Sequence, residues 1–187
     1  MITIMSDILV TRLSTLAQHE QQFAADEILF RAGDPVRSLF LVVVGAVKLT
    51  RSLPHGAPLT LQHARPGAIL AEASIFAERY HCEGVATEDS VVRAVPLRRL
   101  DAELANQPEL ARAWIRHLAQ EVQRARAQAE VLSLKTVAAR IDAWIALMDR
   151  PLPPRGRWRQ VASEIGVTPE ALYRELARRR KLGHSEQ

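Results

Sequence analysis

Residues 157–181, RWRQVASEIGVTPEALYRELARRRK, carry the pattern of two short helices joined by a tight turn. The first, apolar helix ends near Ile165, and Gly166 follows it. Glycine readily adopts the positive φ that a tight turn between helices needs. Thr168 is a favourable N-cap for the second helix, and Pro169 suits the first helical position. The stretch therefore predicts a helix-turn-helix.

The second predicted helix has an apolar face and a polar face. The apolar residues expected to face inward are Ala171, Leu172, Leu176 and Ala177. The residues free to face outward are Glu170, Tyr173, Arg174, Arg178 and Arg180. A helix-turn-helix of this layout places its second helix in the major groove of DNA. Double-stranded DNA is therefore the expected partner.

The charge distribution points the same way. The 187-residue chain has a net charge of only +4, but residues 150–181 hold nine Lys or Arg against three Glu. Such a local excess suggests a polyanionic partner. A solvated basic face is the alternative, and it is less favoured because the charges coincide with the helix-turn-helix pattern.

Several classes of protein are not expected. Cys82 is the single cysteine, so an intrachain disulfide cannot form, which fits a reducing cytosol. The sequence has neither an 18-residue apolar run nor the features of a signal peptide, so a cytoplasmic protein without a membrane partner is expected. It also lacks the nucleophile-elbow, Walker and zinc-protease motifs, so we do not expect an enzyme.

The N-terminal half has two kinds of sequence pattern, first helical and then strand-like. Residues 6–22 have apolar positions near helical spacing, which predicts a short helix. From residue 23 to about 97, short apolar runs alternate with Gly- and Pro-containing turns, among them residues 54–56, which predicts a β-sandwich or barrel. Residues 72–78 look like one short helix within it. The fold class predicted for the whole chain is α+β.

The C-terminal half is predicted to be helical. A short helix over 99–105 precedes a long one that begins at Pro108, and a further amphipathic helix covers 134–148. In the long helix, apolar residues recur at alternating spacings of three and four. This narrow stripe favours a dimer seam over packing on the helix's own domain. The predicted seam consists of Ile115, Leu118, Val122, Ala125, Ala129 and Leu132.

This order of elements resembles the Crp/Fnr superfamily of bacterial transcription regulators. The segments that carry the resemblance are Ala32-Gly33-Asp34-Pro35, Val44-Gly45-Ala46-Val47-Lys48-Leu49, Pro66-Gly67 followed by Ala71-Glu72, and Gly166 to Arg174. Each segment is weak alone, but together they follow the family's order along nearly the whole chain.

The resemblance implies a domain organisation. Residues 1–107 would form a double-stranded β-roll, the jelly roll of cyclic-nucleotide-binding domains. Residues 108–133 would form the dimerisation helix, and residues 134–187 a helix-turn-helix DNA-binding domain. After Lys181 only six residues remain, too few for the β-hairpin that the family adds, so little or no wing is expected.

The resemblance also implies which residues read DNA. It places base contacts on Glu170 and Arg174, with Tyr173 as a further candidate. Independently, Glu accepts from the amine of cytosine, and Arg binds guanine with two hydrogen bonds. The alternative for Glu170 is that its carboxylate, in the first turn, stabilises the helix by interacting favourably with the helix dipole. The residues expected to contact phosphate are Thr168, Arg178, Arg179, Arg180 and Lys181.

The effector pocket departs from the family pattern. In cyclic-nucleotide-binding relatives, a Glu holds the ribose, and an Arg followed by Ser or Thr holds the phosphate. Glu72 matches the Glu, but Tyr80 and His81 occupy the other positions, and Arg79 lies one residue away. Tyrosine is not the planar cation that a cyclic phosphate needs. These four residues are the pocket candidates, and an effector other than cAMP or cGMP, or none, is expected.

No cofactor is predicted. One Cys and one adjacent His do not make a closed metal site, so no metal is expected at residues 81–82. A haem ligand at His81 and a redox role for Cys82 are minor alternatives.

The sequence thus predicts a homodimeric regulator that reads a roughly palindromic operator, with RNA polymerase as a further candidate partner. The alternative is a ligand-binding or protein-interaction module of the same fold that has lost sequence-specific DNA binding.

Overall fold

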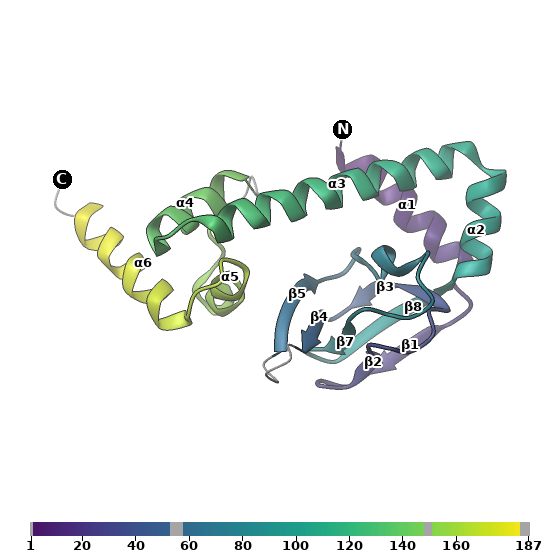
Figure 1. The fold of residues 1–187 in the computed structure, drawn as a ribbon, viewed down its shortest axis with the longest axis horizontal. Helices are drawn as coiled ribbons and strands as arrows, with labels where there is room; N and C mark the ends of the chain where they lie inside the picture. Colours follow the sequence, from purple (N-terminus) through teal and green to yellow (C-terminus); the bar gives the residue numbers. More distant parts are fainter. Residues whose placement is uncertain (1, 53–57, 148–150, 184–187) are drawn as a thin grey trace. The chain divides into compact units, whose positions relative to one another are not determined.

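The computed structural model describes residues 2–52, 58–147 and 151–183, and its α+β fold is drawn in Figure 1. The α-helices are α1 (Ile2–Leu16), α2 (Leu97–Asn106), α3 (Pro108–Ser133), α4 (Val137–Leu147), α5 (Trp158–Glu164) and α6 (Pro169–Gly183). The strands are β1 (Glu20–Phe23), β2 (Ile28–Phe30), β3 (Ser38–Val44), β4 (Val47–Ser52), β5 (Pro58–Ala64), β6 (Ile69–Leu70), β7 (Glu83–Ala86) and β8 (Ser90–Pro96). Short 3-10 helices are η1 (Glu72–Ser74) and η2 (Arg155–Arg157).

The strands form a double sheet. One sheet has the order β1-β8-β3-β6, the other β2-β7-β4-β5, and every recorded pairing is antiparallel. Strands far apart in sequence pair within each sheet, as in a jelly roll. The predicted α+β class and β-roll are therefore confirmed. The predicted turn at residues 54–56 lies outside the described residues.

Strand β3 is apolar along almost its whole length because both of its faces are covered. Phe40 and Val42 point into the core between the sheets, whereas Leu39 and Leu41 pack on the helical side. Successive side chains of a strand face opposite sides, so a strand covered on both faces needs apolar residues at consecutive positions.

The helical side of this sheet is covered by α1, α2 and the first part of α3. Leu13, Leu100 and Trp114 are buried there. These elements belong to a compact unit of residues 1–118, and residues 119–187 form a second unit. The boundary falls inside α3, so the predicted three-part division, which isolates that helix, stays a prediction.

The second unit is a small helical domain with its own core. Val131 of α3 packs with Ile141 and Trp144 of α4, and with apolar residues of α5 and α6. Helix α4 begins at Val137 because Thr136 caps it: its hydroxyl accepts a hydrogen bond from the backbone N–H of Ala139 at 3.1 Å.

Some predicted bounds were wrong. The N-terminal helix covers residues 2–16 and not 6–22, because residues 20–23 form β1, paired with β8. An ion pair of 2.7 Å between Glu20 and Arg93 crosses this pairing. The predicted helix at 72–78 is only the 3-10 turn η1. The helices predicted at 99–105 and 134–148 are confirmed, with bounds shifted by one to three residues.

Candidate nucleic-acid interface and sensory pocket

Helix α5 ends in the turn predicted at Gly166. The backbone N–H of Val167 donates to the carbonyl of Ala162 at 2.9 Å, and that of Gly166 to the carbonyl of Ser163 at 3.2 Å. With Gly166 at a φ of +63°, these bonds make a Schellman motif, which supplies hydrogen-bond donors to the last carbonyls of a helix. The direction of α6 relative to α5 follows from this turn.

Helix α6 begins where the sequence predicted. Pro169 is its first residue, and the hydroxyl of Thr168 accepts a hydrogen bond from the backbone N–H of Ala171 at 3.2 Å. Leu172 and Leu176 are buried in the core of the second unit. The inward face is therefore held by packing, and the opposite face is presented outward.

Glu170 and Arg174 lie on that outward face. Both are exposed, and their spacing of four residues places them one turn apart. Among the described residues, no ion pair joins either side chain to another. The structure therefore brings the two predicted base readers together with their polar groups accessible to a ligand.

Tyr173 has a different environment from its neighbours on α6. Its half-buried ring lies 5.3 Å from that of Trp158, at an angle of 46° between the ring planes. The guanidinium carbon of Arg155 lies 5.8 Å from the centre of the Tyr173 ring, within range of a cation–π interaction. Trp158 is itself held, because its indole N–H donates to the carbonyl of Pro153 at 2.8 Å.

The basic tail of α6 is partly neutralised within the molecule. Arg178 donates two hydrogen bonds to Glu175, at 2.8 and 2.7 Å. Arg179 bonds Glu175 at 2.9 Å, Asp142 at 2.6 Å and the carbonyl of Ala138 at 2.9 Å, which ties α6 to α4. Hydrogen bonds from Arg178 and Arg179 lower the pKa of the Glu175 carboxyl to about 2. Arg179 thus has a structural role that the sequence did not reveal.

Arg140 of α4 has a structural role that was not expected from the sequence. Its guanidinium donates to the carbonyls of Leu132 at 3.0 Å and Leu134 at 2.7 Å, where α3 ends. It also donates to the carbonyls of Ile165 and Gly166, both at 2.9 Å, in the turn before α6. We call this set of hydrogen bonds the Arg140 clasp.

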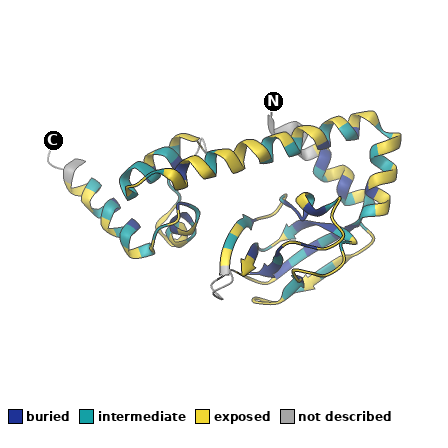
Figure 2. Ribbon diagram, viewed as in Figure 1, coloured by how far each residue is buried: buried dark blue, intermediate teal, exposed yellow. Residues whose placement is uncertain are grey.

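The predicted dimer seam on α3 is largely uncovered. Ile115 is 65% exposed, Val122 50% and Leu132 42%. The two seam alanines are also exposed, whereas Leu118 is half-buried and packs on the core of the first unit. Figure 2 shows how much of the middle of α3 is exposed. Apolar residues left exposed at heptad spacing suit a helix partner.

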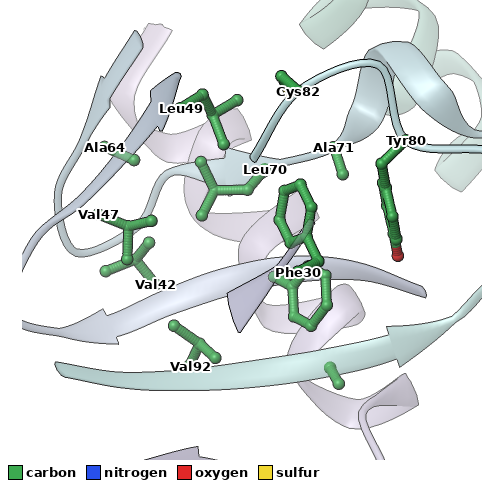
Figure 3. Packing of buried hydrophobic residues seen from close by; sticks show 12 residues of the cluster. Phe30, Val42, Val47, Leu49, Ala64, Leu70, Ala71, Tyr80, Cys82 and Val92 are labelled. Atoms are coloured by element: carbon green, nitrogen blue, oxygen red, sulfur yellow. The ribbon is translucent and has the colours of Figure 1, made fainter. Parts of the chain in front are cut away.

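In the β-roll, Tyr80 belongs to the buried core between the sheets. Its ring lies 4.3 Å from that of Phe30, which stacks on Phe40 at 5.2 Å, and Figure 3 shows Phe30 beside Tyr80. Its hydroxyl donates to the carbonyl of Ser38 at 2.6 Å. The aromatic rings therefore fill the region between the sheets near η1.

Arg79 lies in a different environment from Tyr80. Its guanidinium is exposed and donates to the carbonyl of Gly33 at 2.6 Å. Ala71, the residue before Glu72, is buried with a φ of +67°, a conformation that is unfavourable for any residue with a Cβ. Glu72 follows it as the first residue of η1. The four pocket candidates are therefore close in the chain but differ in environment.

His81 and Cys82 have separate environments. His81 is exposed, and its Nδ1 lies 2.9 Å from the hydroxyl of Ser74. Partial burial and the charge of Arg51 lower the pKa of the His81 imidazole. Cys82 is 1% exposed, and burial raises the pKa of its thiol, so it is protonated at neutral pH. Among the described residues, no group of three or more His, Cys, Asp or Glu could hold a metal ion.

Comparisons with known proteins identify the class of the first unit. Residues 20–107 match the model of the cyclic nucleotide-binding domain, in agreement with the β-roll. The transcriptional regulator LdrP of Thermus thermophilus is 28% identical over 138 residues, covering 73% of this chain and 68% of that protein.

Solved structures extend the likeness to both units. FixK2 from Bradyrhizobium japonicum superposes with a TM-score of 0.73 at 24% identity, covering 88% of this chain and 85% of that one, which shows the shared fold. A Crp-family transcriptional regulator from Thermus thermophilus has a TM-score of 0.62 at 26% identity, covering 87% of this chain and 85% of that one.

Residues 20–107 form a cyclic nucleotide-binding domain, and the likeness to transcription regulators of the Crp/Fnr type extends over both units. The resemblance noted from the sequence is thereby confirmed. Within the described residues, the helices are too short or too polar to cross a lipid bilayer.

Proposed function

We propose that this protein is a homodimeric transcription regulator that reads a roughly palindromic operator through α6. The observation that carries the proposal is the outward pair Glu170 and Arg174 on a helix whose start is held by a cap and whose other face is buried. In a dimer, two such helices would enter successive major grooves.

Base reading is assigned to Glu170 and Arg174. The Arg174 guanidinium has the planar fork that binds the O6 and N7 atoms of guanine, and the Glu170 carboxylate accepts from the amine of cytosine. Neither group has to leave an ion pair with a described residue before it contacts a base. Both roles require exposed polar atoms, which the position on α6 supplies.

Phosphate contact is assigned to the start and the end of α6. The free backbone N–H groups beside Thr168 suit a phosphate oxygen. Arg178, Arg180 and Lys181 are exposed and would contact the DNA backbone without reading sequence. Arg179 is the weakest candidate of the set, because its hydrogen bonds to α4 would have to be given up first.

Dimerisation is assigned to the exposed apolar stripe of α3. The two alanines of the stripe would allow the paired helices to approach closely. A seam of this kind would keep the two recognition helices at a spacing set by the protein.

The β-roll is assigned the sensory role, with a ligand other than cAMP or cGMP. The core position of Tyr80 supports this assignment, because a phenol packed on Phe30 offers no cation to a cyclic phosphate, and the guanidinium of Arg79 already donates to the carbonyl of Gly33. We assign no catalysis to the chain. Action in the cytoplasm, with RNA polymerase as a further partner, would follow from the regulatory role.

The test is selection of duplexes from a random pool, with and without cAMP, followed by a salt titration of affinity by fluorescence anisotropy. We expect the same palindromic sequence in both selections, and affinity that falls steeply with salt because phosphate contacts release counterions. Arg174→Ala is expected to weaken operator binding by about 1–3 kcal/mol and to relax the base preference.

The result that contradicts the proposal is a folded dimer that enriches no sequence. That result would favour the second candidate, a ligand-binding or protein-interaction module. A dependence on cAMP would instead contradict only the assignment of the sensory ligand.

A further inference from the structure

Residues 155–159 hold three arginines that form no ion pair with a described residue, unlike the basic tail of α6. Arg155, Arg157 and Arg159, which we call the arginine arm, are all exposed. Among the described residues, no carboxylate lies within ion-pairing distance of any of them. This contrasts with Arg178 and Arg179, whose charges are shared with carboxylates.

The position of the arm is set by aromatic packing. Trp158, between two of the arginines, is held by Pro153 through its indole N–H and lies against the ring of Tyr173. Arg155 lies over the ring of Tyr173, with its guanidinium carbon 5.8 Å from the ring centre. Tyr173 stands next to Arg174 in the sequence, so a cation from the loop before α5 is placed beside the recognition helix.

We propose that the arginine arm is a second set of DNA-backbone contacts, and that Tyr173 is the platform that positions Arg155 and not a base reader. The inference rests on the proposed function, since it adds contacts to the same interface. The ligand chemistry is the phosphodiester backbone of a duplex.

The chemistry of the guanidinium supports this role. An arginine that stacks on an aromatic face keeps its N–H groups at the edge of its plane, where they can donate to two phosphate oxygens. The first helix of a helix-turn-helix crosses the DNA backbone, and the arm lies at the start of that helix. Tyr173 is half-buried and its ring packs against Trp158. Its environment therefore differs from that of the exposed base readers Glu170 and Arg174.

The experiment measures the slope of log affinity against log salt on the selected operator. Each phosphate contact contributes about 0.9 to this slope, so Arg155→Ala should make it shallower by about 1.8 in a symmetric dimer. Arg157→Ala and Arg159→Ala should act in the same direction. Tyr173→Ala should reproduce the effect of Arg155→Ala, and the double variant should add little further change.

Two comparisons separate the platform role from a loss of structure or of charge. Tyr173→Phe keeps the ring, so it should restore the slope that Tyr173→Ala loses and should select the same operator. Arg12→Ala removes one exposed charge from α1 in the other unit and should leave the slope unchanged. Circular dichroism and the thermal midpoint of each variant show that it is folded.

The outcomes distinguish this inference from the proposed function. If Arg155→Ala keeps the wild-type slope while Arg174→Ala still relaxes the base preference, the arm is not a DNA contact, and the proposed function stands. If Tyr173→Phe selects a different operator, Tyr173 is a base reader and the platform role is wrong. If the wild-type dimer binds no duplex, both proposals fail.

Discussion

At the scale of single residues, Gly166 decides the path between α5 and α6. Its φ of +63° lies in the left-handed region, which costs little for glycine and more for any residue with a Cβ. A Cβ built there would lie 2.7 Å from the Cδ2 of Leu132, a flexible side-chain end that can move aside. Backbone strain is therefore the main cost of a larger residue at this position.

We predict that Gly166→Ala lowers the free energy of unfolding by about 1–2 kcal/mol. Gly156→Ala is the matched control, because a Cβ there would meet nothing within 4 Å and its φ is not in the left-handed region. Urea unfolding, followed by tryptophan fluorescence, measures both variants. Equal stability of the two variants would show that the turn does not need glycine.

At the scale of secondary-structure elements, the Arg140 clasp holds the end of α3 and the turn before α6 to one side chain of α4. Both segments belong to the second unit, so the clasp ties the helix-turn-helix to the last turn of α3. Only arginine has enough N–H donors in one plane to bridge these carbonyls.

We predict that Arg140→Lys destabilises the second unit by about 1–3 kcal/mol, because a single ammonium cannot reach both ends and leaves carbonyls without a charged donor. Operator affinity should fall as the turn loosens. Arg126→Lys, at an exposed position of α3, makes the same chemical change outside the clasp and should be neutral within about 0.5 kcal/mol. Thermal unfolding of both variants would show the difference, and a neutral Arg140→Lys would rule out the clasp as a stabilising device.

At the scale of the whole molecule, the proposed function depends on a second copy of the chain. The apolar stripe of α3 is the surface available for it, since Ile115, Val122 and Leu132 are exposed in one chain. Removing this apolar area from water would favour association.

We predict that Val122→Glu weakens dimerisation at least about tenfold, or by about 1.4 kcal/mol, because it buries a carboxylate in the seam. Gln123→Glu adds the same charge next to the stripe, at an exposed position outside it, and should leave the dimer intact. Sedimentation equilibrium over a range of concentrations measures both. A Val122→Glu variant that stays as dimeric as the control would place the dimer interface elsewhere.

Local patterns in the sequence were enough to locate most elements. The stripe of α3, the capped start of α6 at Pro169 and the glycine turn before it are each encoded by a few neighbouring residues. Such features depend on helix periodicity and on backbone preferences, which act over short distances along the chain. The same is true of the outward placement of Glu170 and Arg174.

What depends on distant partners could not be predicted. Residues 20–23 form a strand only because β8 pairs with them, and η1 stops after one turn inside the roll. Whether a side chain such as Arg179 binds DNA or ties two helices together depends on Asp142, 37 residues away.

The sequence by itself determined the α+β class and the helix-turn-helix with its outward pair Glu170 and Arg174, because each follows from local spacing and turn chemistry. The resemblance to the superfamily rests instead on four short segments that occur in the family's order. The tertiary structure alone decided that Tyr80 belongs to the core, that Arg140 clasps the turn, and that Arg155 is positioned on Tyr173. These three contacts form between segments that packing and hydrogen bonding bring together in the folded chain, whatever the distance between the segments in the sequence.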